Sequence, residues 1–294
     1  GVSTVDGSEF TGEAVILATG HSARDIYKLL AKKKILLEQK PFAVGMRIEH
    51  PQPLIDSIQY TYERGTERPR ILPAARYSLA TKIDNRGVHS FCMCPGGLIV
   101  PAATSPGELV VNGMSLSRRD SPFANAGIVV SITPKIWEEM GFKGPLGGLE
   151  LQQSLEKKFF EAGDGSQAAP AQRVSDFLMR NKSQSLPPSS YIPGLISAKL
   201  HEILPPFLYE HLAMGLFEFD RKLPGFITSD AVLVGLESRT SSPVRIPRDA
   251  DTFMHPEVGG LFPCGEGAGY AGGILSAGID GIKIAEAMAL SMLK

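Results

Sequence analysis

The sequence has few cysteines, few aromatic residues and no long apolar run. Its 294 residues include three cysteines and one tryptophan, and aromatic residues make up 7% of the chain. Three cysteines are too few for a disulfide framework and are typical of a reducing, intracellular setting. The apolar runs are short, as at 14–18, whereas a membrane-spanning helix needs about 20 residues. These absences predict a soluble intracellular protein without a membrane span.

A strong charge of either sign is absent as well. The chain has 30 Lys and Arg against 31 Asp and Glu, which gives a formal net charge of −1. Such a balance provides no positive field to hold nucleic acid or an anionic membrane. Hydrophobic residues make up 43% and charged residues 21%, values that exclude a disordered chain. The length alone predicts about two domains.

Glycine and proline, by contrast, are abundant, with 31 and 22 residues, and they divide the chain into short segments. Residues 1–12 are predicted to form a hairpin with a type I′ turn at Asp6-Gly7. The run at 13–20 is typical of a buried strand, and 23–34 is typical of a helix. Because a strand would begin almost at Gly1, which is not Met, we expect this chain to be the C-terminal part of a longer protein.

The rest of the chain predicts a sheet-rich part, a helix-rich part and a return to α/β structure. Short β-type runs come first, at 42–49, 76–82, 88–94, 98–102, 109–112 and 126–132. Helices are predicted next, at 149–162, 171–180, 196–203 and 206–219. Strands at 231–236 and 260–264 and an amphipathic helix at 279–293 complete the prediction.

The strongest motif is the glycine-rich stretch at 259–281, in which nine of 23 residues are glycine. A strand that leads into a glycine loop and then a helix lets backbone N–H groups approach a nucleotide. Glu266, at the end of this strand, could accept hydrogen bonds from sugar or polyol hydroxyls. The alternative is a tightly packed corner without a ligand. Ala18-Thr19-Gly20 is a weaker motif of the same kind, and an ordinary turn would explain it equally well.

The two motifs together resemble those of two-domain flavoproteins. The sequence is similar to a family described as FAD-dependent dehydrogenases or NAD(P)/FAD-dependent oxidoreductases, found in bacteria and plastid-bearing organisms. The resemblance rests on blocks that run nearly the full length of the chain: ILATGHSARDIY (16–27), KPFAVGMRIEHPQ (40–52), SFCMCPGG (90–97), VVNGMSLSRRD (110–120), APAQRVSDFL (169–178), LESRTSSPVRIPRD (236–249) and PCGEGAGYAGGILSAGIDGIKIAE (263–286).

The resemblance implies an α/β fold: part of a Rossmann-type FAD-binding domain with a large inserted α+β substrate domain. Residues 1–38 would form the first part of the FAD-binding domain and 251–294 its return strand and final helix. The insert would span 39–250, with a sheet at 40–134 and helices at 148–220. The family's N-terminal βαβ unit, with its G-x-G-x-x-G motif, is missing, because the glycines at 265–269 do not have that spacing.

The resemblance also implies which residues contact FAD. The implied cofactor-binding residues are Thr19, Gly20, His21, Gly265, Glu266, Gly267, Gly272, Gly273 and Ile274. The last three would lie beside the flavin pyrimidine, where a helix N-terminus would stabilise the negative charge of the reduced ring. Thr240, Ser241 and Ser242 would lie on the substrate or flavin-ring side.

Catalytic residues are harder to predict, and the candidates are Cys92, Cys94, Arg239 and Arg245. The two cysteines would share one strand face at a Cα separation of roughly 6.6 Å, at the upper edge of disulfide geometry. They are either a redox pair or two small buried hydrophobic residues. The two arginines would hold an anionic substrate or form structural salt bridges. No metal site is expected, because four ligands with zinc spacing are absent.

Two functions follow from these observations. The first is an FAD-dependent oxidoreductase of a small-molecule substrate, with NAD(P)H as a candidate electron donor, in the cytoplasm or in an organelle such as a plastid. The second is a non-catalytic, flavoprotein-derived scaffold that binds a partner. A simple NAD-dependent enzyme is disfavoured, since no first βα unit carries G-x-G-x-x-G.

Overall fold

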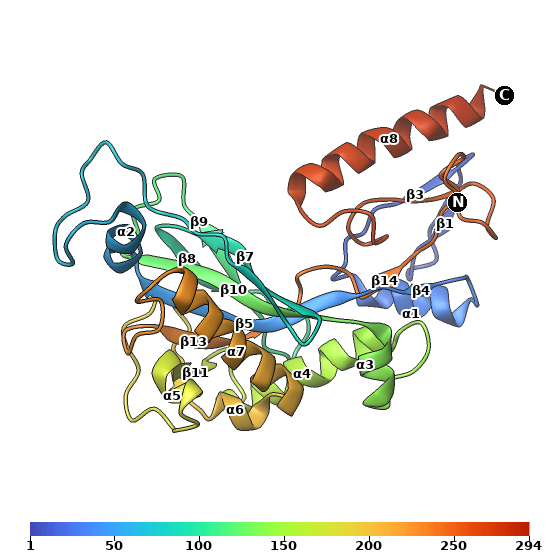
Figure 1. The fold of residues 1–294 in the computed structure, drawn as a ribbon. Coiled ribbons are helices and arrows are strands. Elements are labelled where there is room, and N and C mark those ends of the chain that lie inside the picture. The colour runs from blue at the N-terminus through green and yellow to red at the C-terminus, as the bar shows by residue number, and fades with distance from the viewer. Residues whose placement is uncertain (294) are drawn as a thin grey trace. The chain divides into compact units, whose positions relative to one another are not determined.

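The computed structural model describes residues 1–293 and shows a mixed α/β protein of two compact units (Figure 1). Unit 1 contains Gly1–Phe42, Thr133–Leu151 and the stretch from Arg239 onward. Unit 2 contains Ala43–Ile132 and Gln152–Ser238. The α/β class expected from the sequence is therefore confirmed, whereas the domain borders at 38 and 250 stay predictions.

Unit 2 is built on a mixed sheet of seven strands in the order β12-β11-β13-β5-β10-β7-β6. Its strands are β5 (Phe42–Pro51), β6 (Ala80–Ile83), β7 (Arg86–Cys94), β10 (Phe123–Ile132), β11 (Ala169–Arg173), β12 (Leu195–Ser197) and β13 (Val232–Glu237). β11 and β12 run parallel, while β6–β7, β7–β10, β5–β13 and β11–β13 are antiparallel. All of β5 except its last residue is buried, as expected of a strand covered on both faces.

Helices and a hairpin pack on this sheet. Helix α7 contacts β6, β7 and β10, and the hairpin of β8 (Gly97–Pro101) and β9 (Val111–Ser115) contacts β7, β10 and β13. A Cβ on Gly215 of α7 would lie 2.6 Å from a methyl group of Val88, so a small residue lets the helix approach the sheet. The helices that lie wholly or mainly in unit 2 are α2 (Gln52–Tyr60), α4 (Gly147–Gly163), α5 (Val174–Leu178), α6 (Leu200–Ile203) and α7 (Pro206–Lys222).

Unit 1 contains three small two-stranded sheets: an antiparallel hairpin of β1 (Val2–Ser3) and β2 (Glu9–Phe10), a parallel pair of β3 (Val15–Leu17) and β15 (Leu261–Pro263), and an antiparallel pair of β4 (Glu38–Gln39) and β14 (Val244–Arg245). Its helices are α1 (Arg24–Lys32), α3 (Pro134–Glu139) and α8 (Ile274–Met292). One apolar cluster gathers around Tyr27 and Leu149, and another joins Phe262 and Cys264 to Ile284.

The N-terminal hairpin forms as predicted, but its turn is not of type I′. Gly7 has a φ of 86°, whereas Asp6 is not among the residues with positive φ. The backbone N–H of Gly7 donates to the Thr4 carbonyl, and the Thr4 N–H donates to the Ser8 carbonyl. These bonds define a three-residue loop that ends in a left-handed glycine. The Asp6 carboxylate accepts a bond from the Ser8 N–H at 3.0 Å, which stabilises this wider loop.

Two of the predicted helices are wrong in their first halves. Residues 169–173 form strand β11 before α5 begins at Val174, and 195–197 form β12 before α6 begins at Leu200. Gln172, which is fully buried, donates through its amide to the carbonyl of Asn181. Pairing of β11 with both β12 and β13 outweighs the local helical pattern, because the neighbouring strands satisfy its backbone groups.

Candidate functional site

Strands β3 and β15 bring the two glycine motifs together within unit 1. The strands are parallel, with Leu17 opposite Pro263, so the loops that follow them leave the same edge. A Cβ on Gly267 would lie 2.6 Å from the carbonyl oxygen of Gly20, closer than such atoms approach in real structures. The two backbones can touch only because residue 267 has no side chain. We call this contact between 19–21 and 265–267 the glycine corner.

Open space lies beside several glycines of this region. A Cβ built on Gly20, Gly265, Gly272 or Gly273 would meet no atom within 4 Å. Gly20 and Gly265 have φ values of 76° and 75°, a region that glycine adopts without steric cost. There is thus room beside the backbone at the corner, where Gly20 is half-buried and Gly265 is buried, and at the start of α8, where Gly272 is exposed.

His21 and Glu266 face each other across the glycine corner. His21 Nδ1 lies 2.9 Å from Glu266 Oε1, and the two side chains are 17% and 25% exposed. A carboxylate has two acceptor oxygens, and His21 contacts one of them. Thr19, next to His21 in the sequence-predicted site, is exposed. The structure therefore brings together four of the residues predicted from the two motifs.

Tyr27 of α1 supports the corner from within the core. Its hydroxyl donates to the Gly267 carbonyl at 2.7 Å and lies 3.0 Å from Ser242 Oγ. Burial raises the pKa of Tyr27 to about 12, against the lowering effect of the hydrogen bond with Ser242. Ser242 is itself buried and donates to the Val244 carbonyl at 2.5 Å. Ser242 therefore holds the loop in place, and its location on the substrate or flavin-ring side stays a prediction.

The other residues of the 239–245 segment have separate surroundings. Arg239 is buried and donates to Ser22 Oγ at 3.2 Å. Thr240 is also buried, while Ser241 is half-buried. The Arg245 guanidinium lies 5.2 Å from the centre of the Tyr270 ring. Their predicted roles toward a substrate or flavin ring stay predictions.

The sequence analysis missed an ion pair that holds the corner to α8. Asp280 accepts both Arg248 NH1 and NH2, at 3.0 and 2.7 Å, and also the Gly265 N–H at 2.7 Å. Arg248 stacks on Tyr270 with 3.8 Å between guanidinium carbon and ring centre. Burial would raise the pKa of Asp280, but the hydrogen bonds from Arg248 and Gly265 hold it below the ordinary value. The sequence signal that could have revealed this ion pair is Asp280 itself, a single acidic residue on an otherwise apolar side of the final helix.

The start of α8 is the most open part of this site. Ile274, its first residue, is 93% exposed. The Gly272 N–H donates to Ser276 Oγ at 3.2 Å, and the Gly273 carbonyl accepts the N–H of Ala277. The N–H groups of the first helical turn have no partner inside the helix and point toward its N-terminus. This end of α8 is therefore suited to an anionic or hydrogen-bond-accepting ligand group.

Unit 2 contains a second polar cluster, around Arg47 of β5. This arginine is fully buried and donates through Nε to Asn125 Oδ1 at 2.8 Å and through NH1 to Glu237 Oε2 at 2.7 Å. NH1 also lies 3.5 Å from Asn112 Oδ1, and NH2 lies 2.6 Å from the Cys92 carbonyl and 3.6 Å from Cys94 Sγ. The sequence analysis missed Arg47 and Glu237, although each lies in a largely apolar strand.

Cys92 and Cys94, the predicted cysteine candidates, therefore lie against a buried positive charge. Cys92 is exposed and Cys94 is buried, and both thiols are free. Within residues 1–293, no group of His, Cys, Asp or Glu has a metal-binding arrangement. No helix in this range is long and apolar enough to cross a membrane.

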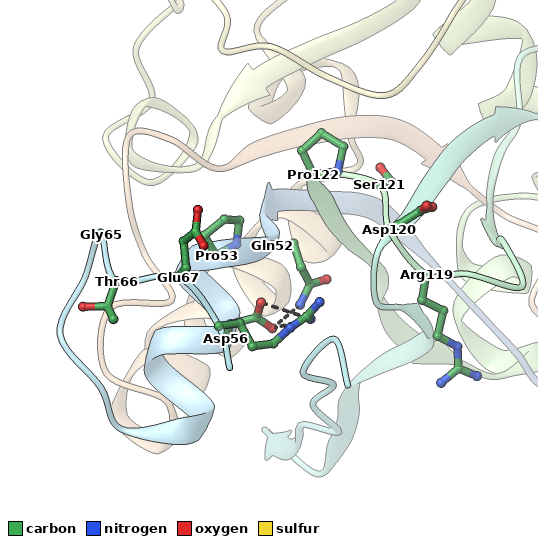
Figure 2. A pocket seen from close by; sticks show the side chains of 11 residues that line it. Gln52, Pro53, Asp56, Gly65, Thr66, Glu67, Arg119, Asp120, Ser121 and Pro122 are labelled. Atoms are coloured by element: carbon green, nitrogen blue, oxygen red, sulfur yellow. Dashed lines mark hydrogen bonds and ion pairs between the residues drawn. The ribbon is translucent and has the colours of Figure 1, made fainter. Parts of the chain in front are cut away.

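A third polar group lines a hollow of about 420 Å³ at the start of α2 (Figure 2). Asp56, buried at its centre, accepts the Gln52 amide at 2.8 Å and the Ala75 N–H at 2.7 Å. Arg68 NH1 lies 3.2 Å from the other carboxylate oxygen. Both carboxylate oxygens of Asp56 thus have partners within the protein. We interpret this group as a structural support for the loop before β6.

These observations define a mixed α/β protein with an accessible glycine-rich strand–loop–helix corner. A sequence model of the family described as "FAD-dependent protein, C-terminal domain-like" matches residues 41–240. The match spans more than half of the chain, so the chain belongs to this family. An uncharacterised protein of Clostridium beijerinckii is 45% identical over 288 residues, which are 96% of this chain and 52% of the relative.

The family supports FAD as the cofactor and confirms the resemblance to an FAD-dependent family. The matched region includes the cysteine pair, whereas the glycine corner lies outside it. The chain spans about half the length of the curated relative that it matches. The reaction, the substrate and NAD(P)H as electron donor remain predictions.

Proposed function

We propose that this chain is the C-terminal part of an FAD-dependent oxidoreductase and supplies one wall of its cofactor site. The observation that carries the proposal is the contact of Gly20 with Gly267 at one edge of a parallel strand pair, in a chain of an FAD-dependent family. The glycine corner and α8 would then be the C-terminal portion of a Rossmann-type FAD-binding domain, and unit 2 would contribute the substrate side.

The residues present fit such a cofactor. The open space beside Gly20, Gly265 and Gly272 is what close approach of a ligand to the backbone requires. Glu266, oriented by His21, would accept hydrogen bonds from ribityl hydroxyls. The N–H groups at the start of α8 would face the pyrimidine edge of the flavin ring, whose nitrogen and carbonyl oxygen atoms accept hydrogen bonds.

FAD, when bound, supplies the hydride or electron-pair chemistry. The chain's own contribution is position and electrostatics. The positive end of the α8 dipole would stabilise negative charge on a ring held over Gly272 and Gly273. Tyr27 keeps the corner in place by its bond to the Gly267 carbonyl, and Asp280 holds the Gly265 N–H and Arg248 together.

The exposed side of α8 favours a site that is completed by more protein. The large exposed apolar residues of this helix are Ile274, Leu275, Ile279, Ile282, Leu290 and Met292. The relative contains nearly as much additional sequence as the matched part. We propose that a segment of this additional half packs on the exposed side of α8 and supplies the remaining contacts to FAD.

Flavin retention tests the proposal. The protein extended to the length of the relative is mixed with FAD, desalted and examined by visible absorbance, and we expect flavin bands. Gly272→Leu should abolish retention, because the side chain enters the open space beside α8 without meeting protein atoms. Gly259→Leu is the matched control, since it also meets no atom within 4 Å but lies before β15, at the other end of that strand.

The outcomes separate the two functions. Flavin that is retained by wild type and Gly259→Leu, and lost from Gly272→Leu, supports the cofactor site. Flavin that survives Gly272→Leu moves the site away from α8. A colourless extended protein contradicts the enzyme and leaves the scaffold function, in which case the chain should be stable without a cofactor.

A further inference from the structure

A bulge in strand β7 places the two cysteines differently from a regular strand. Cys94 pairs with Asn125 of β10 and Phe91 pairs with Gly127, so Cys92 and Met93 together face one residue. Cys92 has a φ of 46°, which a residue with a side chain seldom adopts. Bulges of this kind redirect a side chain and are frequent next to functional sites.

The bulge turns the two thiols toward different surroundings. Cys92 is exposed, while Cys94 is buried and donates through Sγ to the Cys92 carbonyl at 3.3 Å. A Cβ on Gly97 would lie 2.8 Å from the Cβ of Cys94, so the inner cysteine is packed closely from behind. One thiol is therefore accessible, and the second is buried and bonded to the backbone of the first cysteine.

The accessible cysteine lines a hollow of about 460 Å³ with polar walls. Gln59, Arg76, Ser78 and Ser90 contribute to these walls. Gln59 and Arg76 also line an adjoining hollow of about 360 Å³, together with Arg119. Cationic side chains on the rim favour a ligand that carries carboxylates.

The buried Arg47 brings a positive charge to the cysteine pair. Its five N–H donors have five acceptors at 2.6–3.6 Å, and the most distant acceptor is Cys94 Sγ. Glu237, fully buried, balances the charge. A Cβ on Gly113 would lie 1.9 Å from Arg47 NH2, so a glycine is required where the guanidinium lies.

The pKa values of the two thiols are moved in opposite directions. A hydrogen bond from Cys94 and the charge of Arg47 outweigh burial and lower the pKa of Cys92 to about 6. The same hydrogen bond, together with burial, raises the pKa of Cys94. Other titratable groups around the pair are Glu237, the buried Tyr77 and Arg76 on the rim. Both shifts favour a thiolate at the outer cysteine and a protonated thiol at the inner one.

We propose that Cys92 and Cys94 form a thiol–disulfide exchange site that reduces small anionic disulfides. The Cys92 thiolate attacks one sulfur of the disulfide, which forms a mixed disulfide and releases one thiolate. Cys94 then gives its proton to solvent and attacks Cys92 Sγ, which closes the Cys92–Cys94 bond and releases the second thiolate. The cysteine pair loses two electrons and the disulfide gains two. No step involves a flavin, so the test of this site is independent of the test of the proposed function.

The test uses an excess of dithiobis(nitrobenzoate), an anionic aromatic disulfide that releases a coloured thiolate at each exchange. The reduced chain should release two equivalents rapidly and end without an adduct by mass spectrometry. Cys94→Ser should release one equivalent rapidly and retain the adduct on Cys92. Cys92→Ser should lose the rapid phase, whereas Cys264→Ser, the same change at the buried third cysteine, should keep it.

Two further readouts separate exchange from a merely exposed thiol. The rapid phase should lose half of its rate near pH 6. At pH 7 it should run about two- to threefold faster than a free cysteine, whose pKa is about 8.5, because the roughly 30-fold larger thiolate fraction is offset by a roughly tenfold lower nucleophilicity. Arg76→Gln should slow the anionic reagent more than neutral dithiodipyridine. Circular dichroism melting of each variant shows whether it is folded.

An adduct that stays on Cys92 in the wild type would overturn the proposal, because Cys94 would then not resolve it. A rapid phase that follows an ordinary thiol pKa, or that survives Cys92→Ser, would overturn it as well. Disulfide closure in a folded wild type, together with trapping in Cys94→Ser, would establish the exchange site.

Discussion

Helices α7 and α8 differ more in burial than in length or apolar content. α7 has 17 residues and buries an apolar side that includes Leu208, Leu212, Leu216 and Phe219. α8 has 19 residues, of which Asp280 and Ile284 are buried, and its other large apolar side chains are mostly exposed. Apolar content alone therefore does not identify the side of a helix that its own chain covers. This chain therefore covers the apolar side of α7 and leaves most of the large apolar side chains of α8 exposed.

The largest effect is expected in α7. Phe219→Ala should lower the free energy of unfolding by about 3–5 kcal/mol, because Phe219 is fully buried and packs edge-on against Phe226. Urea unfolding followed by far-ultraviolet circular dichroism measures it. Phe217→Ala is the control within the same helix, since Phe217 is 54% exposed. Equal losses for both variants would mean that α7 is not covered as described.

A smaller effect is expected at the buried charge of α8. Asp280→Asn should cost about 1–3 kcal/mol at pH 7 by weakening bonds to a charged partner. The folded pKa of Asp280 is below its ordinary value. The contribution of this carboxylate is therefore present above pH 3.8, and it is lost as the pH falls through the folded pKa.

Trp137, the single tryptophan, is buried in unit 1, so its fluorescence reports the unfolding of the unit that contains α8. The difference between wild type and Asp280→Asn should shrink below pH 4. Glu286→Gln, on an exposed part of α8, should show no such dependence. A constant difference between pH 3 and pH 7 would contradict an ionised Asp280 in the folded state.

The smallest effect is expected on the exposed side of α8. Ile282→Ser should change the stability of this chain by less than about 0.5 kcal/mol, because Ile282 is 63% exposed. Ile284 lies on a different side of the same helix and is fully buried. Ile284→Ala should therefore lower the free energy of unfolding by about 2–5 kcal/mol. In the extended protein, Ile282→Ser should become costly if additional sequence covers α8. If Ile282→Ser lowered the stability of this chain and of the extended protein equally, additional sequence would not cover α8, and α8 would not differ from α7 in this way.

The fold was predictable where local pattern and tertiary contacts agree. The glycine stretch at 259–281 predicts a strand, a loop and a helix, and the structure has them in that order. At 171–173 the apolar spacing favours a helix, but two neighbouring strands impose β structure. Helix α2 was not predicted from the sequence, although the proline in its first turn is compatible with a helix start.

The sites were predictable only in part, for a related reason. The glycine corner is visible as two motifs because glycine marks close backbone approach at both ends. Arg47 and Glu237 lie 190 positions apart, and their pairing depends on the adjacency of β5 and β13. The bulge that separates the surroundings of Cys92 and Cys94 depends on the register of β7 against β10. A single sequence shows neither strand order nor register.

The saturated guanidinium of Arg47 also offers a spectroscopic use. Its Nε–H is buried and bonded to Asn125, so proton exchange with water requires opening of the sheet and should be slow. In a nitrogen-edited NMR spectrum this group should give a resolved signal at a pH where exposed arginines give none. Because NH2 of the same group contacts the Cys92 carbonyl and Cys94 Sγ, that signal would report the oxidation state of the pair without any added label.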